Sequence, residues 1–145
     1  SESPYFGTIA KADICIEVGP QAHGTLVASL FETTEKVVIR YLELAEEFNQ
    51  GVLQKKPRRS VEIFTQWKDL DYPRDSFGNI SAMIHPDFQA ADFSELKEGD
   101  NIFRTFDGKN ISYRGETVYP LFVNEAAYYE KKIAMSLTKK SLENW

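Results

Sequence analysis

The sequence predicts an α+β chain, in which one strand–turn–helix unit precedes a β-rich segment. The first observation is an amphipathic pattern from about Ser29 to Asn49, where apolar residues recur at helical spacing. The second is a change of composition after the basic cluster at 55–59, where β-branched and aromatic residues alternate with polar ones. Because an open α/β sheet needs several strand–helix units, the single unit indicates a piece of a larger domain.

The first unit combines an apolar run with the helix. Residues 13–19 are bounded by turn residues, which predicts a buried strand. Ser29 and Glu32 have the spacing of a capping box at the start of the helix. Gly51 follows the last apolar position and is expected to end the helix in a left-handed conformation.

Glu17 stands near the end of the predicted strand, where ligands gather in open α/β sheets. Burial of a carboxylate costs free energy unless a partner compensates, and burial would raise its pKa. Two interpretations follow: a general base with a tuned pKa, or a structural glutamate paired with Lys or Arg. Cys15 in the same run is expected to be a buried core thiol and not a nucleophile.

The second segment is predicted to be mostly β. Strands are expected at 60–67, 80–84, 102–106, 111–114 and 117–123. A turn at 107–110 would join two of them into a hairpin, and Pro120 suggests an edge or a bulge. Asn124 is the expected N-cap of a helix over 125–134, and no assignment is made for residues 135–145. Of the adjacent Tyr128 and Tyr129, either one packs and one presents its hydroxyl, or both pack.

Composition limits the partners. The net charge of −5 argues against a phosphate-binding surface, so we expect no nucleic acid, and the basic cluster is expected to be a solvated linker. No apolar stretch is long enough to span a bilayer and no signal peptide is visible, which predicts no membrane. The lone Cys15 fits a reducing compartment and a cytoplasmic location. His23 and His85 are far apart and predict no self-contained zinc site.

Several segments together carry a resemblance to a known family. They are 16–21, 71–75, 84–86, 96–108 and 118–132, in this order. They resemble the aspartoacylase/succinylglutamate desuccinylase family of zinc hydrolases, and the resemblance covers nearly the whole chain. It implies that residues 1–52 are the last strand and helix of a zinc-carboxypeptidase-like α/β catalytic domain. Residues 53–145 would be a β-rich C-terminal domain that caps and narrows the active site.

The resemblance also implies a mechanism and site residues. In this family a zinc-bound water attacks the amide carbonyl of an N-acyl amino acid, and zinc lowers the pKa of that water. The residue that matches the family's general base is Glu17, which would contact substrate and later pass the proton to the leaving amine. The residue that matches the family's tyrosine ligand of the substrate carboxylate is Tyr128. The implied partner is a small N-acyl amino acid such as N-acetylaspartate.

The chain departs from the family pattern in two ways. The zinc ligands, a His-x-x-Glu pair and a later His, have no match, so we expect no metal ligand here and no zinc binding or turnover by this chain alone. Gly7 and Ser3 stand where the family has a substrate-binding arginine and a tyrosine, although Tyr5 is close to the latter. The substrate therefore stays open between N-acetylaspartate and another acyl amino acid.

Two alternatives to an aspartoacylase-like activity remain. One is a desuccinylase-like N-acyl amino acid hydrolase. The other is a binding or oligomerisation module without chemistry of its own. Uncovered strand edges and helix faces of the truncated α/β portion would favour self-association into a homo-oligomer.

Overall fold

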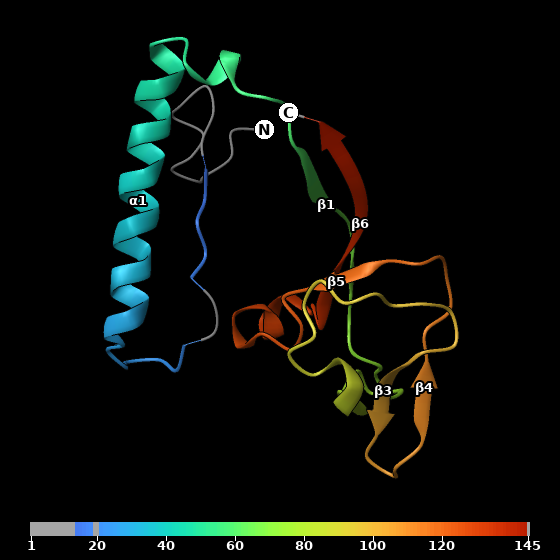
Figure 1. Cartoon of the computed structure of the whole chain (residues 1–145). Helices are drawn as coiled ribbons and strands as arrows, with labels where there is room; N and C mark the ends of the chain where they lie inside the picture. The colour runs from blue at the N-terminus through green and yellow to red at the C-terminus, as the bar shows by residue number, and fades with distance from the viewer. Residues whose placement is uncertain (1–13, 19–20, 145) are drawn as a thin grey trace, which may run out of the picture. The chain divides into compact units, whose positions relative to one another are not determined.

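The computed structural model describes residues 14–18 and 21–144, which contain both helices and strands (Figure 1). The predicted α+β class is confirmed. The chain separates into two compact units that divide between Pro57 and Arg58, inside the basic cluster. The assignment of these units to a catalytic domain and a capping domain stays a prediction.

The first unit consists mainly of the helix α1 (Ala28–Asn49), followed by the short 3₁₀ helix η2 (Leu53–Lys55). The N-cap of α1 is Val27, which offers no side-chain hydrogen bond, so the predicted capping box is wrong. Ser29 already lies within the first helical turn and cannot act as the cap. Gly51, with φ 72°, takes the predicted left-handed conformation just after the helix.

The predicted strand at 13–19 is not formed by its described residues, 14–18, which have no regular structure and are exposed. A strand needs a hydrogen-bonded neighbour, and neither sheet of the described chain includes this segment. The burial predicted for Cys15 is wrong for the same reason, since this thiol is exposed.

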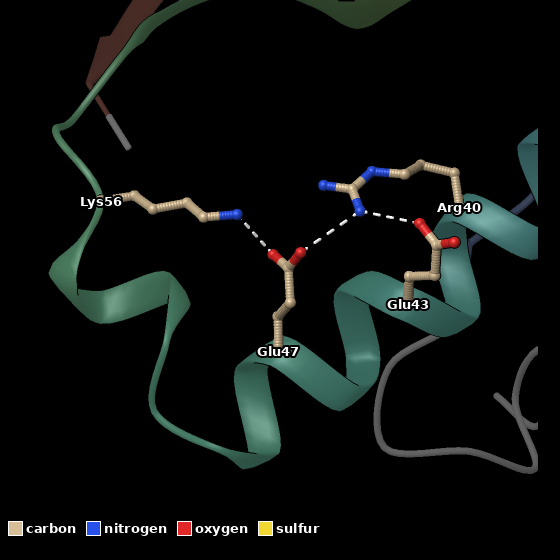
Figure 2. A network of polar contacts seen from close by, with 4 residues as sticks. All are labelled: Arg40, Glu43, Glu47 and Lys56. Carbon is tan, nitrogen blue, oxygen red and sulfur yellow. Dashed lines mark hydrogen bonds and ion pairs between the residues drawn. The ribbon is translucent and has the colours of Figure 1, made fainter.

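A network of ion pairs ties the basic cluster back to α1 (Figure 2). Glu47 lies between two cations: its carboxylate is 3.3 Å from Nη1 of Arg40 and 2.5 Å from Nζ of Lys56. Arg40 also contacts Glu43 at 2.9 Å. The hydrogen bond from Lys56, followed by that from Arg40, lowers the pKa of Glu47. The cluster is therefore solvated as predicted, but Lys56 is paired with the helix.

The apolar face of α1 is not buried by the residues that the structure describes. The helix contains no buried residue. Phe31, Leu42 and Phe48 on it are each at least 60% exposed. The predicted apolar face is thus present, but the described residues do not bury it. No described helix is long and apolar enough to cross a membrane.

The second unit is built from two small antiparallel sheets (Figure 1). Sheet one has the strand order β1-β6-β5, and sheet two has the order β2-β3-β4. The elements are β1 (Ser60–Leu70), β2 (Ala82–Ile84), η3 (Pro86–Phe88), β3 (Asn101–Thr105), β4 (Asn110–Ser112), β5 (Tyr119–Leu121), η4 (Ala126–Lys131) and β6 (Met135–Asn144). The β1–β6 ladder runs from Ser60 opposite Asn144 to Leu70 opposite Met135, with a bulge between Gln66 and Lys68.

The core of this unit lies between the two sheets' strands and the loops that follow them. Its fully buried side chains include Leu96, Ile102, Val118, Met135 and Leu137. These come from β3, from β6 and from the bridge that pairs Leu96 with Val118. Burial along β6 stops after Thr138, so only its first half belongs to the core.

The five strands predicted for this unit are confirmed with shifted ends, whereas the predicted helix and its cap are wrong. The hairpin is β3–β4, and the strand with Pro120 is β5, at an edge of its sheet. The central strand β6 lies in the tail that the sequence left unassigned. The helix expected over 125–134 is only the 3₁₀ helix η4, and Asn124 is not its cap, because its backbone is left-handed (φ 59°).

Candidate functional site

The segment that carries Tyr128 is a loop whose two ends meet at the core. The backbone N–H of Asn124, at the start of the loop, donates to the carbonyl of Ala134 at 2.9 Å. The N–H of Ala134 donates in turn to the carbonyl of Leu70, the last residue of β1, at 2.7 Å. We call residues 124–134 the tyrosine loop. We call the hydrogen-bonded ends of this loop, at Asn124 and Ala134, its neck. The neck fixes where the loop and its helix η4 project from the core of the second unit.

Tyr128 and Tyr129 have different surroundings on η4. Tyr128 is half-buried, with its ring 5.2 Å from that of Phe122. The ammonium of Lys131 lies 5.4 Å from the centre of the Tyr128 ring. Tyr129 is 59% exposed. Tyr128 is therefore the packed tyrosine of the pair, and its role as a substrate ligand stays a prediction.

Asn124 joins three segments through one side chain. Its Oδ1 accepts a hydrogen bond from the hydroxyl of Tyr72 at 2.5 Å, and its Nδ2 donates to Oε1 of Gln89 at 3.2 Å. Asn is one of the few residues that adopt a left-handed backbone without a large steric cost. The neck of the tyrosine loop is therefore linked to the chain after β1 and to the chain after η3.

An open groove of about 640 Å³ lies beside this network. Its lining combines aromatic, polar and small apolar residues, which are Tyr72, Asn124, Glu125, Ala126, Ala127, Tyr129 and Glu130. Burial, with contributions from Tyr129 and Asp71, raises the pKa of Tyr72, so its hydroxyl stays a donor at neutral pH. Except for Tyr72, the whole lining belongs to the tyrosine loop.

Glu17 lies in the first unit and is exposed, so the burial predicted for it is wrong within this chain. The physical reason is that the described residues provide no sheet around it. Its assignment as general base stays a prediction. Gly7, Ser3 and Tyr5 lie outside the described residues.

The described residues do not fit a zinc ion, because no group of three His, Cys, Asp or Glu side chains among them could hold a metal. His23 is exposed in a turn. His85 precedes η3, and its Nδ1 accepts the N–H of Asp87 at 3.3 Å.

Sequence reasoning missed Tyr72 and Gln89 and assigned a wrong role to Asn124. The bonds among these residues span 35 and 52 positions of the chain, which no local pattern reports. One signal was available for Asn124, because Asn is enriched at left-handed positions as well as at helix N-caps.

The second unit matches a known domain family. Residues 59–140 match the family model described as the AstE/AspA barrel-sandwich hybrid domain, so this unit is a barrel-sandwich hybrid domain. The match covers more than half of the chain. The chain belongs to the AstE/AspA family.

Individual relatives support this result. The chain is 46% identical over 140 residues to a "Probable aspartoacylase" of Trichodesmium erythraeum (strain IMS101), covering 96% of this chain and 47% of the relative. It is 44% identical to an aspartoacylase of Danio rerio, covering 93% of this chain and 42% of the relative. It is 40% identical to the N-acyl-aromatic-L-amino acid amidohydrolase (carboxylate-forming) of Mus musculus, covering 92% of this chain and 42% of the relative.

A solved structure matches as well. The crystal structure of murine aminoacylase 3 matches with a TM-score of 0.84 and 37% sequence identity, covering 94% of this chain and 45% of that chain. The chain thus spans less than half the length of the relatives it matches, and it corresponds to their C-terminal part.

Proposed function

We propose that the complete protein hydrolyses the amide bond of N-acyl amino acids and releases a carboxylate and a free amino acid. The observation that carries the proposal is the similarity of 40–46% to relatives named aspartoacylase and N-acyl-aromatic-L-amino acid amidohydrolase, over at least 92% of this chain. The packed Tyr128 beside the cation of Lys131 supports it, since the product side of such a substrate is an amino acid carboxylate.

In this proposal the two predicted site residues have separate roles. Tyr128 donates its phenolic hydrogen to the substrate carboxylate and orients the substrate. Glu17 takes a proton from the attacking water and later delivers it to the leaving amine. The zinc that the family resemblance implies would be held by residues other than the described ones, which form no suitable group of ligands.

Two substrate classes are supported by specific observations. N-acetylaspartate follows from the relatives named aspartoacylase. N-acyl aromatic amino acids follow from the similarity to the mouse amidohydrolase of that name. N-succinyl amino acids remain a third class, from the family resemblance. Turnover of these three substrates by the complete protein, assayed in parallel, identifies the preferred one.

We also propose a cytoplasmic location and self-association. The lone Cys15 is consistent with a reducing compartment, and no described helix could cross a membrane. The exposed apolar side chains of α1 favour association with further surface, either of the complete protein or of a second copy.

The replacement Glu17→Gln tests the catalytic part of the proposal. In the complete protein we expect kcat to fall by about 10²–10⁴-fold, because the amide cannot accept the proton. Metal content by elemental analysis and KM should stay close to those of the wild type. Glu32→Gln, an isosteric change at an exposed position on α1, is the matched control and should retain full kcat. Normal turnover by the Glu17→Gln variant would refute the assignment.

A further inference from the structure

Tyr72 connects the neck of the tyrosine loop to the core through its side chain. Its ring lies 6.0 Å from the ring of Phe103, which is buried. Its backbone N–H donates to Oδ1 of Asp71 at 2.7 Å, and Asp71 is held by two hydrogen bonds from Arg74, at 2.7 and 3.0 Å. Tyr72 is therefore fixed at both its backbone and its ring, and its hydroxyl presents a fixed donor to Asn124.

The tyrosine loop itself has little packing of its own. None of the six residues of η4 is buried. Lys132, which follows η4, has a left-handed backbone (φ 61°), and so do Phe122 and Asn124 on the other side (φ 57° and 59°). Non-glycine residues in this region cost free energy and persist where the surroundings enforce them. The position of η4 thus depends strongly on the bonds at its neck.

We propose that Tyr72 and Asn124 are positioning residues for Tyr128, holding the tyrosine loop so that the phenol of Tyr128 meets the substrate carboxylate. The inference rests on the proposed function, in which Tyr128 binds substrate. Hydrogen bonding to a carboxylate demands close placement of the donor, and small displacements weaken it. Loss of the Tyr72–Asn124 bond should therefore weaken substrate binding and leave the chemical step nearly unchanged.

The test is a double-mutant cycle in the complete protein, with N-acetylaspartate and an N-acetyl aromatic amino acid as probes. We expect Tyr72→Phe to raise KM by about 3- to 10-fold, with kcat within about 2-fold of the wild type. Tyr128→Phe should raise KM as well. In the Tyr128→Phe background, Tyr72→Phe should have no further effect on KM, because the residue through which it acts is already lost.

Tyr113→Phe is the matched control for Tyr72→Phe. Tyr113 is buried in the same unit, its hydroxyl donates to the carbonyl of Glu116 at 3.0 Å, and burial raises its pKa as it does that of Tyr72. The change deletes one hydrogen-bonded phenol hydroxyl in each case. Because Tyr113 makes no bond to the tyrosine loop, its variant should keep the wild-type KM.

A variant at Asn124 tests the same bond from its other partner. Asn124→Gly tolerates the left-handed backbone but removes the acceptor, so KM should rise as in Tyr72→Phe. A wild-type KM for Asn124→Gly would overturn the inference. This variant also decides the matter if Tyr72→Phe does not fold.

Hydrogen exchange supplies a readout independent of activity. Tyr72→Phe should speed exchange at the amides of Tyr128 and Ile133 and leave those of β3 unchanged. Unchanged exchange in the loop would overturn the inference.

The cycle separates the inference from the proposed function. A wild-type KM for Tyr128→Phe would reject the substrate-binding role of Tyr128. A raised KM for Tyr128→Phe, combined with a wild-type KM for Tyr72→Phe or with fully multiplicative effects in the double variant, would reject only the positioning role.

Discussion

The two units of this chain differ in whether they bury their own apolar surface. The second unit, 58–144, has a continuous core in which Leu137 of β6 is fully buried. The helix α1 of the first unit contains no buried residue, and Leu42 on its apolar face is 62% exposed. Leu42 lies on a helix with a clear apolar pattern, whereas Leu137 lies on a strand whose burial ends midway along its length. The difference shows that amphipathicity defines a face to be covered but does not supply the covering surface.

This difference also bears on the candidate site. The tyrosine loop belongs to the unit with its own core, and its neck is hydrogen-bonded to Leu70 at the end of β1. Glu17 belongs to a segment that no described sheet supports. We therefore expect the substrate-binding part of the site to be formed within this chain. The proposed general base would need surroundings that the described residues do not provide.

The largest difference in the free energy of unfolding is expected between matched leucine replacements in the two units. Leu137→Ala should lower the free energy of unfolding of the 145-residue chain by about 2–5 kcal/mol, because it opens a cavity in the core. Leu42→Ala should change it by no more than about 0.5 kcal/mol, since the side chain is already exposed and Ala is a strong helix former. Urea denaturation, followed by tyrosine and tryptophan fluorescence, measures both. A comparable loss for Leu42→Ala would break the comparison.

The parts of the fold that were predictable are those set by local chemistry. The β3–β4 hairpin follows from its turn residues, with Gly108 at φ 89°. The strand β1 follows from its composition. By contrast, β6 pairs Met135 with Leu70, far away in the chain, and its burial ends midway along the strand, so no regular alternation reveals it.

The errors share a physical cause, which is dependence on surroundings distant in the sequence. The run at 13–19 has strand-like residues, but a strand forms only beside a neighbour. Burial of Glu17 and Cys15 was inferred from that strand and failed with it. For the site, the sequence drew attention to the adjacent Tyr128 and Tyr129, and the role of Tyr128 came from the family resemblance. The hydrogen bonds of Asn124 were not predictable, because its partners come from segments distant in the sequence.

The smallest effect on the free energy of unfolding is expected from a change at an exposed turn of the second unit. It sharpens the contrast between core and surface. The hydrogen bonds from Lys109 and Thr105 lower the pKa of Asp107 from 3.8 to about 2. The ionised carboxylate therefore stabilises the fold above about pH 4, and this contribution is lost as the pH falls toward 2, where the folded state also takes up the proton.

Asp107→Asn checks this dependence. The variant should be slightly less stable than the wild type at neutral pH, and the difference should shrink steadily between about pH 4 and pH 2. Because the side chain is exposed, the effect at neutral pH should be well below that of Leu137→Ala. Denaturation midpoints at several pH values measure it, and a difference that grows on acidification would contradict the assignment.

Hydrogen exchange of the 145-residue chain, resolved by peptide mass spectrometry, tests the central contrast most directly. At concentrations where the chain is monomeric, the amides of Met135–Thr138 and Ile102–Phe103 should exchange slowly, at rates set by global unfolding of the second unit. The amides of α1 and of residues 14–18 should exchange orders of magnitude faster, because a helix without tertiary packing is only marginally stable. Equal protection of α1 and β6 would contradict the account.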